Sequence, residues 1–592
     1  MKQGMFGTPV ARSSCMSVFH LLWTYSIKAV DNRKKARCVC DGSSRGQVRI
    51  LDHTYANSLE HTGARIFYSV AAAENLVIYG ADATNAFGEA GAPKQGFYVY
   101  PDAAFRSWWT DHLGNPPIPD GYVIPVNRAL QGHPESPRLW EKHIDSILRT
   151  LGLTPTTHEP CLYSGIINNE RVLFMRQCDD FACAAPSAIT CQMLFDMIDD
   201  KLDLPLKPLG LITLFNGVNI HQTKHYIKLS VKTWIEKISD KYPWLFQTST
   251  PHTPLPHSKI FLDAFRQAIG DPNPKHQKDL SSHNGFQYRT AIGELIYAMV
   301  SCRPDLSFAV TKCAQSSACP HQKHYDGVKH ILRYLYTTRD DGIYFWRTQP
   351  NTSLQDVPLP TCKSSNDDNL LLEGRPNTGP LQSVGFVDSD WAACVTTRRS
   401  FTGLCIRLAG GTVAYKSRLQ PTVALSSTEA EFMGACDAAK VLLYVRSILW
   451  DLGIPQEAAS ILYEDNDAAT AMANANKPTP RTRHMDIRYF ALTEWVERDL
   501  IALERVDTSM NMADHFSKQL PPILFSRHVD HILGHVPPPY SPHYKLHAGN
   551  VPTMNYQVSS LSSVVTSPVG TDISSSRELT LTITLTSHEK LA

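Results

Sequence analysis

The sequence has no run of 18 apolar residues, so it offers no candidate transmembrane helix. Its 14 cysteines include no CxxC pair and no regular spacing, which argues against a disulfide framework or a zinc ribbon and favours reduced thiols. The moderately apolar segment 16–27 lacks a small-residue cleavage site and precedes Lys28, which is not typical of a signal peptide. We therefore expect an intracellular protein, cytoplasmic or nuclear, with no membrane partner.

The sequence also has no overall excess of positive or negative charge. The 57 Lys and Arg residues balance 56 Asp and Glu residues and leave a formal net charge of +1 at pH 7. Any nucleic-acid-binding surface must therefore be local. With 592 residues, 43% of them hydrophobic, the chain is long enough for several globular domains. Cys319, His321 and His324 have no second ligand pair nearby, which favours core or surface roles over a zinc site.

Two adjacent carboxylates, Asp179 and Asp180, lie between two β-prone segments. Residues 172–175 (VLFM) are apolar and residues 182–185 (ACAA) are small, a pattern that predicts two short strands joined by a turn. Because an unpaired buried charge is costly, a carboxylate pair at such a turn suits a divalent cation, which prefers oxygen ligands. An exposed acidic hairpin turn is the alternative.

A third carboxylate, Asp82, ends a predicted strand over residues 76–81, which follows a predicted helix over residues 64–75. With Asp179 and Asp180 it would form an acidic set suited to two Mg²⁺ ions and in-line phosphoryl transfer. Between these carboxylates, the Gly and Pro residues of segment 130–140 (LQGHPESPRLW) indicate a shaped loop that opens a helix. The basic segment 33–37 (RKKAR) would contact phosphates or form a solvated face.

A second acidic series lies nearer the C-terminus. Apolar strands predicted over residues 384–388 and 461–466 lead into Asp388 and Asp465. A hairpin signal at residues 410–411 and a helix that stops at Gly453 lie between them. The nearby Asp390 and Asp467 are rivals for the same roles.

The helix between these strands carries two candidate glutamates. Glu429 and Glu431 each lie three residues after a Ser or Thr, which is the spacing of a capping box, so either one would be a capping residue or a functional one. Asp514 opens a last short predicted helix, where it would otherwise be an N-terminal charge that complements the helix dipole.

These stretches resemble, in chain order, motifs of reverse transcriptases and ribonuclease H, and their wording resembles the copia-type (Ty1/copia) retrotransposon polyprotein. In the first series the matching stretches are 35–37 (KAR), Asp82 with Phe87, 131–132 (QG), 138–140 (RLW), 177–180 (QCDD), 209–220, 288–297 and 303–305 (RPD). In the second series they are 388–394 (DSDWAAC), 424–432 (ALSSTEAEF), 464–469 (EDNDAA), 481–490 (RTRHMDIRYF) and 511–520 (NMADHFSKQL). The resemblance covers roughly residues 33 to 520.

The resemblance implies an α/β (α+β) protein: a right-hand polymerase with fingers, palm and thumb, followed by a ribonuclease H-like α/β domain. The expected parts are 1–30 (unassigned), 31–222 (fingers and palm), 223–347 (mainly helical thumb or connection), 348–380 (linker), 381–520 (ribonuclease H-like domain) and 521–592. The last part is a Ser/Thr-rich extension that we expect to be disordered.

The resemblance also assigns roles. Asp82, Asp179 and Asp180 would bind Mg²⁺ (or Mn²⁺) in the polymerase, and Asp388, Glu431, Asp465 and Asp514 would do so in the nuclease. Substrate contacts would come from Lys35 and Arg37 on the triphosphate, Phe87 as the steric gate, Gln131 and Gly132 in the nucleotide pocket, and Phe215 and Gly217 in a primer-grip strand over 215–220. Phe87 and Phe215 have core packing as their alternative. Arg481, Arg483, His484 and Arg488 would contact a nucleic-acid backbone or form a solvated loop.

We therefore predict an RNA-directed DNA polymerase with ribonuclease H activity, whose partners are an RNA template, a DNA primer, the RNA–DNA hybrid and dNTPs. The sequence does not set the oligomeric state. Gln177 stands where the family usually has Tyr, so one alternative is a polymerase-dead nuclease that cleaves RNA–DNA hybrids. A non-catalytic nucleic-acid-binding relic is the other. Because few residues precede Lys35, we expect a truncated element without an integrase region.

Overall fold

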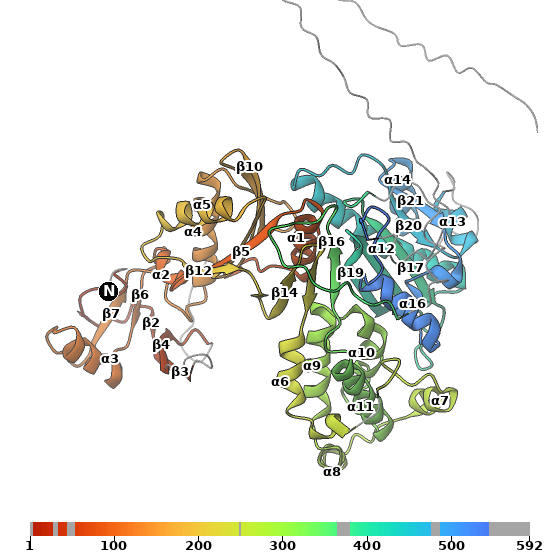
Figure 1. Ribbon diagram of the computed structural model, residues 1–592. Coiled ribbons are helices and arrows are strands. Elements are labelled where there is room, and N and C mark those ends of the chain that lie inside the picture. The colour runs from red at the N-terminus through yellow and green to blue at the C-terminus, as the bar shows by residue number, and fades with distance from the viewer. Residues whose placement is uncertain are drawn as a thin grey trace, which may run out of the picture. The chain divides into compact units, whose positions relative to one another are not determined.

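The computed structural model describes residues 4–27, 34–43, 54–247, 250–363, 379–474 and 486–543 (Figure 1). All of them belong to one unit, Met1–Gly549. Across these ranges, no helix combines the length and the apolar character needed to cross a membrane. The Ser/Thr-rich tail 557–592 and the basic residues Arg481, Arg483 and His484 lie outside the described residues, so what we expect of them stays a prediction.

Short strands near the N-terminus form a four-stranded sheet and a separate hairpin. The sheet order is β1 (Val10–Ala11), β7 (Tyr122–Val126), β6 (Phe97–Val99) and β2 (Val18–Phe19). The hairpin joins β3 (Leu21–Ile27) to β4 (Lys34–Cys40). Phe19, Phe97 and Phe105 form the core here, the last from α3 (Ala103–Ser107), which a π-helix (Trp108–His112) continues. Strands β1 to β3 lie within segment 1–30, to which the sequence assigns no structure.

The first acidic set lies on a six-stranded antiparallel sheet. Its order is β12 (Lys207–Leu211), β5 (Val77–Asp82), β11 (Asp180–Ala185), β10 (Glu170–Gln177), β9 (Leu162–Ile167) and β8 (Thr154–Pro155). Side chains alternate between two cores: Leu173 and Met175 join one cluster, whereas Phe174 and Phe181 join the other. The helices of this region are α1 (His61–Ala73), α2 (Ala86–Glu89), α4 (Ser136–Thr150) and α5 (Ala188–Asp199).

A third sheet and a group of helices follow. The strand order is β13 (Leu214–Phe215), β14 (Val218–Gln222), β15 (Tyr226–Ser230) and β16 (Ile343–Trp346). The single strand expected over 215–220 is wrong, because Asn216 and Gly217 have positive φ and turn the chain into a β13–β14 hairpin. The helices are α6 (Lys232–Ser239), α7 (Lys259–Gln267), α8 (Pro274–Asn284), α9 (Tyr288–Ser301), α10 (Ser307–Ala314) and α11 (Gln322–Thr337), with 3-10 turns at Pro243–Gln247 and Pro304–Leu306.

The second acidic series lies on a five-stranded mixed sheet. Its order is β19 (Gly411–Leu419), β18 (Phe401–Leu408), β17 (Val384–Asp390), β20 (Ser460–Glu464) and β21 (Ile501–Arg505). Strands β17, β20 and β21 are parallel, whereas β18 and β19 form an antiparallel meander with β17. Helix α12 (Ser427–Asp451) packs on β17 and β18. An antiparallel meander followed by two parallel strands, with a long helix between the two groups, confirms the predicted α/β, ribonuclease H-like architecture.

The remaining helices complete this region. They are α13 (Asp467–Ala473), α14 (Asp486–Glu497), α15 (Asp514–Ser517) and α16 (Pro522–Ile532), with a 3-10 turn at Thr508–Met510. Helix α16 corrects part of the prediction that the extension 521–592 is disordered. Its residues Phe525, Val529 and Ile532 recur at helical spacing and are buried.

Candidate active sites

The β10–β11 hairpin brings Asp179 and Asp180 to the strand that carries Asp82. Asp180 is the direct partner of Asp82 across the antiparallel β11–β5 pair. The Ala83 amide donates a hydrogen bond to the Asp179 carbonyl at 2.8 Å. Because partners in an antiparallel pair project to the same face, Asp82 and Asp180 share one face of the sheet.

Two side-chain contacts hold the turn between these strands. Cys178, in the turn, has a φ of +55°, a conformation that is uncommon outside glycine. Trp140 on α4 donates from Nε1 to the Cys178 carbonyl at 2.8 Å. Gln177 accepts a hydrogen bond on Oε1 from the Leu59 amide, also at 2.8 Å. Gln177, the departure from the family's Tyr, therefore ties the acidic hairpin to the segment that precedes α1.

Like charges dominate the electrostatics of this turn. Burial, and then the neighbouring Asp179 and Asp82, together raise the pKa of Asp180 to about 6. Among the described residues, Asp82, Asp179 and Asp180 do not form a group whose carboxylate oxygens all lie within 4.8 Å of one another. The strands bring the three residues to one end of the sheet, but their oxygens do not converge as a set, and the mutual repulsion of these anions favours that separation.

The residues predicted to contact the primer and the sugar lie near this hairpin. Asp180, Phe215 and Gly217 line one cavity of about 550 Å³, together with residues 209 and 212–214. Phe215 is buried, as its core alternative requires, and it still lines that cavity. Phe87 on α2 is partly buried against the core beneath α4 and α5.

The predicted nucleotide-pocket residues lie against β4. The Cys40 amide donates to the Gln131 carbonyl at 2.8 Å. Gly132 has a φ of +93°, and a Cβ there would lie 2.0 Å from the Cys40 carbonyl oxygen, so only glycine fits this close approach. Lys35 and Arg37 lie on the same strand. The structure thus brings these four predicted residues to one strand and the loop that touches it.

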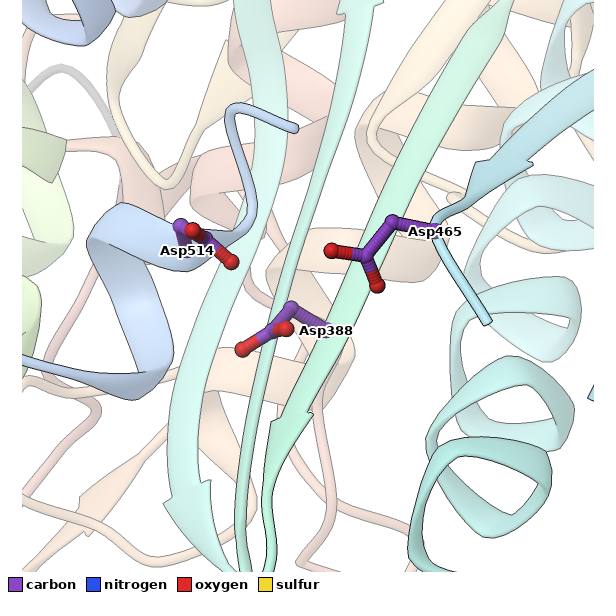
Figure 2. Close-up of side chains that lie close together, drawn as sticks. All are labelled: Asp388, Asp465 and Asp514. Carbon is purple, nitrogen blue, oxygen red and sulfur yellow. The ribbon is translucent and has the colours of Figure 1, made fainter. Parts of the chain in front are cut away.

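The second site is a convergence of three aspartates (Figure 2). Asp388 on β17, Asp465 just after β20 and Asp514 at the start of α15 have carboxylate oxygens within 4.8 Å of one another. Gly403 is the partner of Asp388 on β18, and a Cβ on it would lie 2.5 Å from the Ala513 carbonyl oxygen. The missing side chain therefore lets α15 approach the sheet closely enough for Asp514 to meet Asp388.

Two residues of the 511–520 segment stabilise this convergence. Lys518 Nζ lies 2.9 Å from Asp514 Oδ1 and 3.6 Å from Asp388 Oδ1, and the Ser517 hydroxyl donates to Asp388. Burial raises the pKa of Asp514 to about 8, with Asp388 acting in the same direction and Lys518 against it. Burial lowers the pKa of Lys518, but Asp388 and Asp514 outweigh this and raise it overall. The sequence reasoning identified neither Lys518 nor Ser517.

The structure distinguishes the two candidate glutamates. Glu429 is half-buried, and its Oε2 accepts a hydrogen bond from the Leu425 amide at 2.7 Å at the start of α12. Glu431 is buried and lies with Glu464 and Asp465 in a second group of oxygens within 4.8 Å. Neither rival aspartate, Asp390 or Asp467, belongs to an acidic group of the described chain.

Glu464 is the acidic residue that the sequence reasoning missed. It ends β20 and is completely buried, and its Oε1 accepts hydrogen bonds from the Asp465 and Asn466 amides at 3.1 Å. Burial, and then the neighbouring carboxylates, raise the pKa of both Glu431 and Glu464 far above the usual range. An acidic residue directly before Asp465 was the only sequence signal available.

The donor set fits a divalent cation. Hard oxygen atoms converge from five carboxylates, which is the ligand chemistry of Mg²⁺ and Mn²⁺. Oε2 of Glu431 and Oε2 of Glu464 are buried without a hydrogen-bond partner. Because buried carboxylate oxygens without partners are costly, a cation would satisfy what the protein leaves open.

A protein-family model matches the N-terminal part of the chain. Residues 11–256 match the family model described as "Reverse transcriptase (RNA-dependent DNA polymerase)", and this region includes Asp82 and the β10–β11 hairpin. The matched region is a reverse transcriptase domain.

Relatives extend the match beyond that domain. The chain is 26% identical over 511 residues to the "Retrovirus-related Pol polyprotein from transposon TNT 1-94" of Nicotiana tabacum, which covers 86% of this chain and 34% of the relative. It is 24% identical over 503 residues to the polyprotein from transposon RE2 of Arabidopsis thaliana, which covers 83% of this chain and 30% of the relative. The chain is similar to copia-type (Ty1/copia) retrotransposon polyproteins over most of its length and spans about a third of the length of these relatives.

Among solved structures, one titled "Structure of the foamy viral protease-reverse transcriptase dRH in complex with ds DNA" aligns with a TM-score of 0.43 at 12% sequence identity. The alignment covers 86% of this chain and 68% of that one.

Proposed function

We propose that this chain copies RNA, and then DNA, into DNA from dNTPs, and that it hydrolyses the RNA strand of the RNA–DNA hybrid. The polymerase half is carried by one observation: Asp180 faces Asp82 across β11 and β5, with Asp179 in the adjoining turn, inside the region that matches the reverse transcriptase family. The nuclease half is supported by the convergence of Asp388, Asp465 and Asp514. Because its fourteen cysteines are all free thiols, we propose an intracellular site of action, in the cytoplasm or nucleus.

Residues around the β10–β11 hairpin divide the polymerase work. Asp82, Asp179 and Asp180 hold divalent cations, Mg²⁺ or Mn²⁺. Positive side chains on β4, Lys35 and Arg37, neutralise the triphosphate of the incoming dNTP. Gln131 and Gly132 shape the nucleotide pocket, Phe87 restricts the space at the sugar 2′ position, and the cavity shared by Phe215, Gly217 and Asp180 receives the primer end.

In the nuclease site, Asp388, Glu431, Asp465 and Asp514 hold the cations. Bound cations at either site would activate the attacking oxygen and stabilise negative charge on the leaving oxygen. The Ser517 hydroxyl fixes the orientation of Asp388, and Lys518 offsets the mutual repulsion of Asp388 and Asp514.

The test uses the purified full chain with Mg²⁺, a labelled RNA template and a DNA primer, with and without dNTPs. The double variant Asp179→Asn, Asp180→Asn should lose primer extension by at least about 100-fold, because several kcal/mol of transition-state stabilisation depend on cation ligands. The same variant should keep RNA cleavage, whereas Asp388→Asn should show the reverse. Asp196→Asn, which changes an exposed carboxylate on α5, is the matched control and should keep both activities.

Each other outcome points to a different conclusion. RNA cleavage by the unmodified chain without primer extension would contradict the polymerase proposal. It would favour a nuclease that cleaves RNA–DNA hybrids, in which Gln177 cannot perform the role of the family's Tyr. Extension without cleavage would contradict the nuclease half. A folded protein with neither activity would indicate a nucleic-acid-binding relic.

A further inference from the structure

The nuclease site contains two acidic groups that share one residue. Asp388, Asp465 and Asp514 form the first, and Glu431, Glu464 and Asp465 form the second, each with oxygens within 4.8 Å. Each group has two buried members besides the half-buried Asp465, and in the second group Glu464 is fully buried and Glu431 is 7% exposed. Its members come from α12, from the end of β20 and from the residue that follows β20.

Charge is compensated in the first group but not in the second. Lys518 pairs with Asp388 and Asp514. Within the part of the chain that the structure describes, neither Glu431 nor Glu464 forms an ion pair. Instead each keeps a buried Oε2 atom without a hydrogen-bond partner. Two buried carboxylate oxygens of this kind, on residues whose ligand atoms lie within 4.8 Å of each other, are the arrangement that a cation would complete.

We propose that Glu464 is a further cation ligand, so that Glu431, Glu464 and Asp465 together hold a divalent cation in the nuclease site. This inference deepens the proposed nuclease function and rests on it. Glu464 uses Oε1 to accept the Asp465 and Asn466 amides, which fixes its carboxylate and leaves Oε2 for the cation. Asp465 links this position to the one formed with Asp388 and Asp514.

The test measures cation binding without nucleic acid. The full chain is titrated with MnCl₂ by calorimetry and by electron paramagnetic resonance, which counts the free ion. Glu464→Gln should weaken one class of Mn²⁺ site by about 10- to 100-fold, which is the range found when residues that support a metal site are lost. Glu457→Gln makes the same substitution at an exposed position of the loop before β20 and should bind Mn²⁺ like the unmodified chain.

A second variant and a folding measurement keep the result interpretable. Glu464→Asp keeps the charge but withdraws the carboxylate by one methylene, and it should also weaken Mn²⁺ binding. Thermal unfolding in EDTA should show both variants folded, while the added stability that Mn²⁺ gives the unmodified chain should shrink in them.

Two results would overturn the inference in distinguishable ways. If Glu464→Gln is folded and binds Mn²⁺ as tightly as the unmodified chain, Glu464 is not a ligand, although the nuclease proposal survives. If the unmodified chain binds no Mn²⁺ and Asp388→Asn does not change RNA cleavage, the nuclease proposal fails as well.

Discussion

At the scale of single residues, glycine determines how closely backbone segments approach each other at both sites. Gly403 makes room for α15 beside Asp388, and Gly132 makes room for the Gln131 loop beside Cys40. Gly132 also has a positive φ, so two separate constraints act on it.

Replacing Gly132 should therefore cost more than the backbone conformation alone explains. Gly121 has a positive φ of +78° with open space around its Cβ position, so Gly121→Ala should cost about 1 kcal/mol through backbone strain only. Gly132→Ala adds a contact of 2.0 Å with the Cys40 carbonyl oxygen and should cost at least about 3 kcal/mol in the free energy of unfolding.

Denaturant unfolding of both full-length variants measures this difference, and primer extension reports on the loop. Gly132→Ala should also reduce extension, since Gln131 would move away from the Cys40 amide. Equal costs for the two substitutions would show that the loop yields freely and that the close approach has no structural importance.

Residue-scale prediction from the sequence worked where a carboxylate follows an apolar strand. Asp82 and Asp388 are predicted in this way, whereas the pairing of Asp82 with Asp180 is seen only in the structure. Capping-box spacing alone does not separate Glu429 from Glu431; the family resemblance selects Glu431, and the structure shows that Glu431 is buried. Glu464 is not identified for a similar reason, because the sequence alone does not show that its side chain is buried.

At the scale of elements, helix α1 connects otherwise distant parts of the chain. Most of its residues are buried, and it contacts β10, β15, β16 and β19. Its Arg65 is only 5% exposed and donates to the carbonyls of Val413, Val300 and Ser301 at 2.7 to 3.0 Å. The same guanidinium lies 4.7 Å from the centre of the Tyr415 ring.

Arg65→Met should destabilise the whole unit. The substitution fills a similar volume but leaves three carbonyl acceptors without their donor, which should cost about 3 kcal/mol in the free energy of unfolding. Arg149→Met is the matched control: Arg149 pairs with Asp145 on the exposed face of α4, and its loss should cost less than about 0.5 kcal/mol. Denaturant unfolding followed by tryptophan fluorescence distinguishes the two, and similar small costs in both variants would contradict the connecting role of Arg65.

Elements were predictable where periodicity is strong and less so elsewhere. The helix predicted over 64–75 is α1, shifted by two or three residues, and the hairpin predicted around residues 410–411 is β18–β19. Helix α16 was missed because its Pro and His residues obscured the apolar spacing of Phe525, Val529 and Ile532. Strands β1 to β3 are short and take their partners from distant segments, which local patterns do not reveal.

At the scale of the whole molecule, stability should depend on pH through buried histidines. Burial lowers the pKa of His528 and of His531 to about 3, and nearby cationic groups such as Arg407 beside His531 act in the same direction. In the unfolded chain the pKa of histidine is about 6.5. Below that pH the unfolded state takes up protons that the folded state does not, so stability falls as the pH decreases from about 6.5 towards 4.

Each of these histidines should add a slope of up to about 1.4 kcal/mol per pH unit to the free energy of unfolding in that window. His528 uses Nε2 toward the Ser509 carbonyl, and the side-chain amide of His528→Gln supplies a similar donor without titrating. That variant should show a shallower pH dependence between pH 7.5 and 5.5, whereas His276→Gln, on the exposed face of α8, should match the unmodified chain. Parallel curves for all three proteins would exclude His528 as a source of the dependence.

The contacts of α1 also determine when during translation this part of the protein can complete its folding. Val413 is separated from Arg65 by 348 positions, and Ser301 by 236. At typical translation rates, the ribosome needs on the order of tens of seconds to make that intervening chain. During this interval the part of α1 that packs on β19 has no partner, although β10, β15 and β16 are already made. We therefore expect a chain that ends before the β18–β19 hairpin to leave this part of α1 exposed and to aggregate more readily than the full chain.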